Sequence, residues 1–149
     1  MLTLLGSRFA ILLSDKIFAS LQVWRGALLL SDFLLANPKL LEGKKVLELA
    51  SGTGLTSIVA ATLAGSVTAT DVNRGEILPL IRKNANLNRG VLAQPEKFSV
   101  QELDFFWDNW PPDLEERVMS AEVIAAPFTH SHKKSNNVIS GGVGCRCSL

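Results

Sequence analysis

A glycine-containing bend between two apolar segments is the part of this sequence most suited to chemistry. Val46–Ala50 is short and apolar, Ser-Gly-Thr-Gly follows it at 51–54, and an alanine-rich segment begins at Thr56. Glycines let a chain turn sharply from a strand into a helix, and they leave room for a ligand to approach the backbone. The helix after such a bend directs its free N–H groups at that ligand. The sequence therefore predicts a binding site above Gly52 and Gly54.

Two acidic residues accompany the bend. Asp71 ends the next apolar segment, 17 residues after Gly54 (71 − 54). An acid at the end of a second strand can accept hydrogen bonds from both ribose hydroxyls of an adenosine cofactor. Glu48 lies near the end of the first strand, where a carboxylate can hold a cation. S-adenosylmethionine offers such a cation, because it carries an amino group and a sulfonium.

Two alternatives compete with this interpretation. One is NAD, but the dinucleotide fingerprint requires a third glycine for close packing of helix and strand, and Ser57 stands there. NAD also has no comparable cation for Glu48. The other alternative is an ordinary strand-to-helix turn without a ligand. The acid at the end of the second strand favours a cofactor site over a plain turn, and the cation favours S-adenosylmethionine over NAD.

At these residues the chain resembles the class I, seven-strand methyltransferases, and among them the protein-lysine methyltransferase group. The resemblance runs from Val23 to Ala126. The segments that carry it are Val23–Leu30, Glu48–Leu55, Thr70–Val72, Leu87–Asn88, Leu103–Asp104 with Trp107 nearby, and Ala121–Ala126. The tryptophan-containing helix together with the glycine bend is the specific part of this resemblance.

The resemblance implies S-adenosylmethionine as cofactor and a set of residues that bind it. These residues are Trp24, Glu48, Gly52, Gly54, Asp71, Asp104 and Trp107. Trp24 would lie beside the cofactor, and Glu48 with the two glycines would hold its methionine end. The implied activity is in-line transfer of a methyl group to the neutral amine of a lysine in a protein substrate, and no catalytic residue is assigned.

The other implied contacts concern the nucleoside. Asp71 would bind the ribose, Asp104 would accept from the adenine amine, and Trp107 would stack on the adenine or wall its pocket. The chain also departs from the family. Ala50 replaces a frequent glycine, which its small size should tolerate. Pro127–His130 replaces the aspartate and tyrosine that shape the substrate mouth, which places the acceptor site in question.

Strand-like and helix-like segments alternate along the chain, which predicts an α/β fold with a Rossmann-like parallel sheet and flanking helices. The predicted strands are Val46–Ala50, Val67–Thr70, Phe98–Leu103 and Ala121–Ala126, and the predicted helices are Val23–Leu35, Thr56–Ala64 and Ile77–Asn88. These are about four of the seven strands that the family fold contains, so we expect the sheet to be incomplete.

Length and composition limit the function classes. A chain of 149 residues, 47% of them hydrophobic, has room for one domain with a real core. The net charge of +1 provides no long-range field for nucleic acid or an anionic membrane. No apolar run reaches the roughly 20 residues of a membrane helix. The two cysteines form no disulfide framework, which favours the cytoplasm or nucleus.

Three regions are expected from these patterns. Residues 1–22 form an N-terminal segment that packs on the domain or continues upstream, and 23–126 form the partial methyltransferase domain. Residues 127–149 read as a loop or disordered tail, whose two histidines and two cysteines lack a usual metal spacing. The 23 residues after Ala126 (149 − 126) cannot supply three more strands, since one strand–helix–strand unit takes roughly 30. The last predicted strand would then have an unpaired edge. Because the domain would be incomplete, the alternative to an active enzyme is an inactive module that binds the cofactor or a partner.

Overall fold

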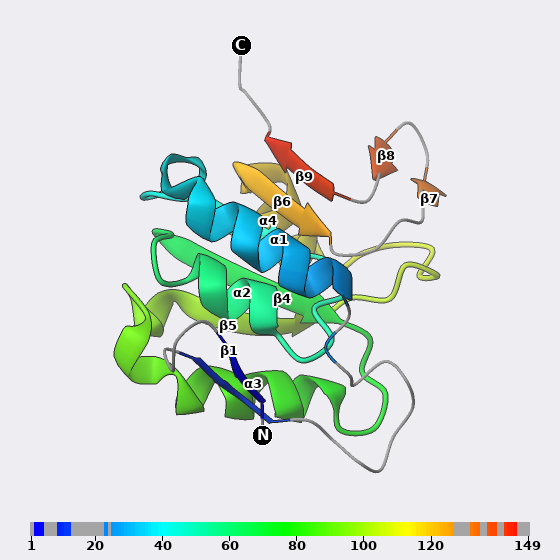
Figure 1. Cartoon of the computed structure of the whole chain (residues 1–149). Coiled ribbons are helices and arrows are strands. Elements are labelled where there is room, and N and C mark those ends of the chain that lie inside the picture. Colours follow the sequence, from blue (N-terminus) through cyan, green and yellow to red (C-terminus); the bar gives the residue numbers. More distant parts are fainter. Residues whose placement is uncertain are drawn as a thin grey trace.

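A computed structural model describes residues 2–4, 9–12, 23, 25–126, 132–134, 137–139 and 142–145. Its centre is a sheet of five strands in the order β5-β4-β3-β6-β9 (Figure 1). These strands are β3 (Lys45–Glu48), β4 (Ser66–Asp71), β5 (Phe98–Glu102), β6 (Val123–Ala126) and β9 (Gly142–Cys145). The first four run parallel, and β9 is antiparallel to β6. The predicted α/β fold with four parallel strands is therefore confirmed.

Helices precede and connect the parallel strands and cover both faces of the sheet. They are α1 (Arg25–Ala36), α2 (Leu55–Ala60), α3 (Ile77–Leu87) and α4 (Pro112–Ser120), with the short 3-10 helices η2 (Pro38–Leu40), η3 (Arg89–Val91) and η4 (Pro95–Lys97). Alternate residues of β3 face opposite sides, as a strand requires. Val46 packs with apolar residues of α1 and α2, whereas Leu47 packs with Leu114 and Val118 of α4. The apolar run of β3 is thus buried from both faces, as is usual for a central parallel strand.

An N-terminal hairpin that the sequence analysis did not predict packs on α3. It consists of β1 (Leu2–Leu4) and β2 (Phe9–Ile11), which pair antiparallel. Figure 1 shows the hairpin beside α3. Phe9 and Ile11 are buried in the same core as α1 and α2. The side chain of Asn88, directly after α3, bonds the backbone of Ala10 in β2, and that of Asn84 on α3 bonds the backbone of Leu12.

The elements that the pattern predicted from Val23 to Ala126 are present, with bounds shifted by a few residues. The sequence analysis did not predict the helix α4, which begins at the Pro-Pro pair 111–112. Proline suits the first turn of a helix, where its missing N–H removes no hydrogen bond, and Pro112 occupies that place. No helix among the described residues is long and apolar enough to cross a membrane.

The expectation of a strand-free tail was wrong for three segments. His132–Lys134 (β7) and Asn137–Ile139 (β8) pair as a short antiparallel hairpin, and β9 adds to the edge of β6. In that ladder Val123 lies opposite Cys145. The edge of β6 is therefore paired and not open as expected. The physical reason is that the N–H and C=O groups of an edge strand accept any extended segment of backbone, whatever its side chains.

Candidate functional site

The bend between β3 and α2 has the sharp geometry that the glycines predicted. The backbone φ angle is 55° at Gly52 and 80° at Gly54, both in the left-handed region. The Gly54 N–H donates to the Ser51 carbonyl at 2.7 Å, which closes the turn. Ala50 also has a positive φ of 52°, and among the described residues it is the one non-glycine that does. The glycine that the family often has at this position would fit this backbone without strain.

Gly54 is required by packing as well as by backbone geometry. A Cβ atom added there would lie 3.0 Å from Cγ2 of Ile81 on α3. The absence of a side chain lets α3 approach the first turn of α2. This contact accounts for a glycine at position 54 without any ligand, so the assignment of Gly54 to the cofactor stays a prediction.

Glu48 lies wholly buried beneath the bend. Its Oε2 atom accepts a hydrogen bond from the Ser57 N–H at 2.8 Å and another from the Ser57 hydroxyl. The side chain has no exposed surface, and this burial raises its pKa to about 7 although the hydrogen bonds from Ser57 oppose the rise. The carboxylate therefore anchors the first turn of α2 and bears a desolvation cost whenever it is ionised.

Three buried oxygens beneath the bend lack hydrogen-bond partners in the described part of the chain. They are Oε1 of Glu48, Oγ of Ser51 and Oγ1 of Thr56. The two hydroxyls are close enough to lower the pKa of Glu48, but they do not reach hydrogen-bonding geometry with it. Buried polar atoms are nearly always paired in native proteins, so each such group calls for an explanation. An ammonium group, with three donors and one positive charge, matches this set of acceptors.

Asp71 lies at the other side of the same bend, at the end of β4. Its Oδ2 atom accepts from the Gly52 N–H, and its Oδ1 atom accepts from the Val72 N–H, each at 2.7 Å. Burial raises the pKa of Asp71 more than these bonds lower it. Each carboxylate oxygen has a second lone pair, which leaves acceptor capacity for a ligand hydroxyl. The structure thus brings both predicted acids to one bend, Glu48 through Ser57 and Asp71 through Gly52.

Asp104 and Trp107 follow the neighbouring strand at the same end of the sheet. The Leu103 N–H donates to the Asp71 carbonyl at 2.9 Å, which places Asp104 one residue beyond a residue bonded to Asp71. One oxygen of Asp104 accepts from the Phe106 N–H at 2.9 Å. Trp107 is half-buried and lines an open hollow of about 480 Å³ together with Trp110. Trp24, the remaining predicted contact, lies outside the described residues.

Asn84 is a residue of this region that the sequence analysis missed. It is fully buried on α3, and its Nδ2 atom donates to the Thr53 carbonyl at 2.9 Å and to the Leu12 carbonyl at 3.2 Å. Its Oδ1 atom accepts from the Leu12 N–H at 2.8 Å. Asn84 therefore ties the bend to the N-terminal strand. A signal was present, because asparagine is unfavourable inside a helix unless its side chain has a specific task.

Comparison with known proteins identifies the family. The family model described as "Lysine methyltransferase" matches residues 14–140 of the chain. The chain belongs to the lysine methyltransferase family. The match continues past Ala126, where we expected the resemblance to end. It includes the glycine bend, both acids and the segment in which Trp24 lies.

Several curated lysine methyltransferases and methyltransferase-like proteins are similar to the chain. Methyltransferase-like protein 22 of Mus musculus is 44% identical over 112 residues, which cover 74% of this chain and 28% of that protein. The protein N-lysine methyltransferase METTL21A of Danio rerio is 34% identical over 106 residues, which cover 68% of this chain and 46% of that protein. The chain thus spans between about a quarter and a half of the length of these relatives.

A solved structure supports the fold. A putative RNA methyltransferase from Pyrococcus horikoshii superposes with a TM-score of 0.50 at 21% sequence identity. The superposition covers 78% of this chain and 67% of that chain. At this identity the likeness shows a shared methyltransferase fold, and what either protein methylates is a separate question.

Proposed function

We propose that the bend at Ser51–Gly54 binds S-adenosylmethionine, the cofactor that the family implies, and that the complete protein methylates a lysine of a protein substrate. The observation that carries the proposal is the set of three unpartnered buried oxygens around Glu48. A cationic amino group bound above the bend would supply the positive charge that the buried acid among them lacks. The name of the family supports lysine as the acceptor.

The residues of the bend have different tasks in this proposal. Glu48 is closed off from solvent, so it acts as a negative charge beneath the bend and as the anchor of Ser57. It is a positioning residue that also balances the charge of the methionine end. The backbone at Gly52 is held by Asp71, whose remaining lone pairs would accept the ribose hydroxyls.

The remaining predicted contacts complete the nucleoside side. Asp104 and Trp107 follow β5 beside Asp71. There Asp104 would accept a hydrogen bond from the adenine amine, and Trp107 would line the pocket around the adenine ring. Trp24 stays assigned to the cofactor from the resemblance. We assign no catalytic residue.

The chemistry needs little more than positioning. When bound, the cofactor supplies an electrophilic methyl group on a sulfonium. The protein has to hold the acceptor nitrogen in line with that methyl group, keep water out, and receive a lysine that has lost its proton. The family membership implies that the acceptor lysine belongs to another protein. The two cysteines, both near the C-terminal end of the sequence, favour a reducing compartment such as cytoplasm or nucleus.

The buried acid argues against NAD as the ligand. A dinucleotide places its pyrophosphate, an anion, above the glycine bend. At this bend the pyrophosphate would face Glu48, which has no cationic partner among the described residues. An ammonium above the same acid is attracted instead.

Calorimetric titration tests the cofactor. We expect S-adenosylhomocysteine to bind the chain and NAD not to bind. Replacing Asp71 by alanine should weaken S-adenosylhomocysteine at least about tenfold, since hydrogen bonds to a charged group contribute roughly 1.5–3 kcal/mol each. Asp32→Ala, an exposed aspartate on α1, is the matched control and should change nothing. Equal affinity in the two variants would contradict the ribose contact.

A second measurement separates an enzyme from a binding module. The chain is incubated with labelled S-adenosylmethionine and a protein extract, and transfer of the methyl group to protein is followed. Transfer that disappears in Asp71→Ala supports the enzyme. Cofactor binding without any transfer supports the alternative of an inactive module, and it leaves the binding site itself intact.

A further inference from the structure

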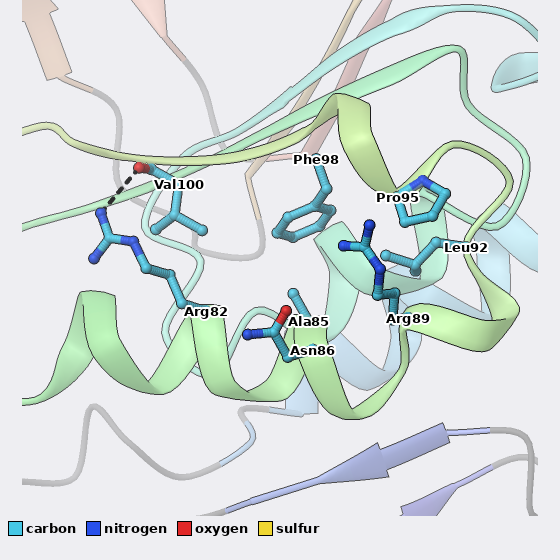
Figure 2. A pocket seen from close by; sticks show the side chains of 8 residues that line it. All are labelled: Arg82, Ala85, Asn86, Arg89, Leu92, Pro95, Phe98 and Val100. Atoms are coloured by element: carbon cyan, nitrogen blue, oxygen red, sulfur yellow. Dashed lines mark hydrogen bonds between the residues drawn. The ribbon is translucent and has the colours of Figure 1, made fainter.

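A second hollow lies on the far side of α3 from the N-terminal hairpin. Its volume is about 270 Å³, and Figure 2 shows it between α3, η4 and β5. Its lining residues are Arg82, Ala85, Asn86, Arg89, Leu92, Pro95, Phe98 and Val100. The hollow includes the start of β5, whereas the cofactor bend and Asp71 lie at the opposite, carboxyl end of the parallel strands. The two sites are therefore separate.

The floor of the hollow is a single stripe of α3 and the turn after it. Arg82, Ala85 and Asn86 follow the spacing i, i+3 and i+4 on α3, which places them on one helix face, and Arg89 begins η3 directly after α3. Figure 2 shows the two arginines at either end of this stripe, with the ring of Phe98 facing the stripe from β5. Arg82 donates from Nη2 to the Val100 carbonyl at 3.2 Å.

Neither arginine of this hollow forms an ion pair with another described residue. The lining residues include no aspartate or glutamate. The ion pairs among the described residues are Lys44–Glu122 and Arg74–Asp104, so neither arginine of the stripe has a carboxylate partner there. A guanidinium has five N–H donors and binds carboxylates in a planar fork. Two such groups beside an apolar wall suit a ligand that is anionic at its ends and apolar in the middle.

The neighbouring strand offers backbone groups to the same ligand. Within the described residues no strand pairs with the outer edge of β5, which ends the sheet. The bond from Arg82 shows that the Val100 carbonyl faces outward from β4. Successive residues of a strand alternate in direction, so the backbone groups of Phe98 and Glu102 face outward too. Such an edge can accept an extended peptide as an added strand.

We propose that this hollow and the edge of β5 bind an extended acidic segment of a partner protein. In that segment two carboxylates flank one apolar side chain on the same face. Arg82 lies on α3 and Arg89 begins η3, two residues after α3 ends, so seven residues of mostly helical chain separate the arginines by on the order of 10 Å. Acids four residues apart on a strand are about 13 Å apart, a difference that flexible arginine side chains span. Leu92, Pro95 and Phe98 would receive the apolar side chain.

The size and charge of the site favour a peptide over a nucleotide or nucleic acid. The hollow is smaller than most cofactor pockets, which measure about 300–1,000 Å³. A hollow of this size has room for one apolar side chain of a bound peptide and the backbone on either side of it. The chain has a net charge of only +1, so it does not produce the broad positive field that nucleic-acid binding uses.

Fluorescence anisotropy with the full chain tests the proposal. The probe is a labelled peptide with the repeat Glu-Thr-Val-Thr-Glu, and the control peptide has glutamine in place of both glutamates. Arg82→Glu and Arg89→Glu should each weaken binding of the acidic peptide at least about tenfold. Lys83→Glu is the matched control, because it makes the same change of charge on an exposed neighbour outside the stripe, and its affinity should stay within about twofold.

Several outcomes would overturn the proposal. They are equal binding of both peptides, an equal effect of all three variants, and tighter binding of a single-stranded RNA through the same arginines. Because the side chain of Arg82 also bonds β5, the thermal unfolding of the variants is compared. If Arg82→Glu unfolds, Arg89→Glu decides the test, because the Arg89 side chain makes no hydrogen bond with another described residue. Calorimetry with S-adenosylhomocysteine should give the same affinity in Arg89→Glu as in the unchanged protein, so this test and the cofactor test fail independently.

Discussion

Replacing Glu48 by glutamine should stabilise the ligand-free protein and change how its stability depends on pH. The carboxylate is fully buried, with its pKa raised to about 7 from an ordinary value of 4.5. Below the ordinary value the group is protonated in the folded and the unfolded chain, and the cost is absent. As the pH rises from 4.5 to 7, the unfolded chain releases the proton and the folded chain keeps it, so the free energy of unfolding falls.

The size of this effect follows from the two pKa values. A difference of about 2.5 units at 1.36 kcal/mol per unit amounts to about 3 kcal/mol, fully present above pH 7. Such a loss is a large part of the 5–15 kcal/mol that typically stabilises a domain. Glutamine retains an acceptor for Ser57 and carries no charge, and its amide can donate to the hydroxyls of Ser51 and Thr56. At about pH 8 the free energy of unfolding of the variant should therefore be about 3 kcal/mol higher than that of the unchanged protein.

Urea unfolding of both proteins between pH 4.5 and about 8 measures this difference. Glu122→Gln is the control, because the exposed Glu122 has a pKa lowered by its hydrogen bond and ion pair with Lys44. Its contribution is present above the ordinary pKa and lost as the pH falls, so that variant should lose stability at high pH. If the difference in free energy of unfolding between Glu48→Gln and the unchanged protein were the same at every pH, the reasoning would be refuted. The same variant should bind S-adenosylhomocysteine more weakly, because the charge beneath the bend is gone.

Three further substitutions test the packing of the bend, each by urea unfolding. Gly54→Ala should cost about 2–4 kcal/mol, from its positive φ and the contact with Ile81, whereas Gly90→Ala, with nothing within 4 Å, should be neutral or slightly stabilising; equal midpoints would contradict the packing argument. Ala50→Gly should raise the free energy of unfolding by up to about 1 kcal/mol, because relief of the left-handed backbone outweighs the entropy that glycine adds to the unfolded chain, and a clear loss would contradict this. Asn84→Ala should cost about 2–4 kcal/mol, because it leaves buried backbone groups of the bend and of the residue after β2 without partners, and it should also weaken S-adenosylhomocysteine.

The buried acid also links stability to binding. A carboxylate that is costly in the free protein becomes favourable when a cation approaches, because the cost of desolvation has been met during folding. Binding a cationic ligand would then recover part of the lost stability. The cofactor that the family uses would therefore account for a buried acid that destabilises the free protein.

The sequence alone determined the local features of this protein. The apolar run of β3, the glycines of the bend and the acid that ends β4 are set by backbone preferences and by periodicity, which act over a few residues. For the same reason the parallel α/β fold could be predicted from alternating segments. The proline start of α4 is equally local, and it was missed because Pro-Pro is common in loops as well as in the first turn of a helix.

The tertiary structure decided which groups meet. Asn84 reaches Leu12 across 72 residues of chain, and Gly54 meets Ile81 only because α3 packs on α2. Ser57 stands where the dinucleotide fingerprint has its third glycine, and the structure shows that it bonds the buried Glu48. The pairing of β9 with the edge of β6 depends on backbone hydrogen bonds, to which side-chain patterns give little guidance. Contacts between distant segments depend on how whole faces pack, and a reading of neighbouring residues does not contain that information.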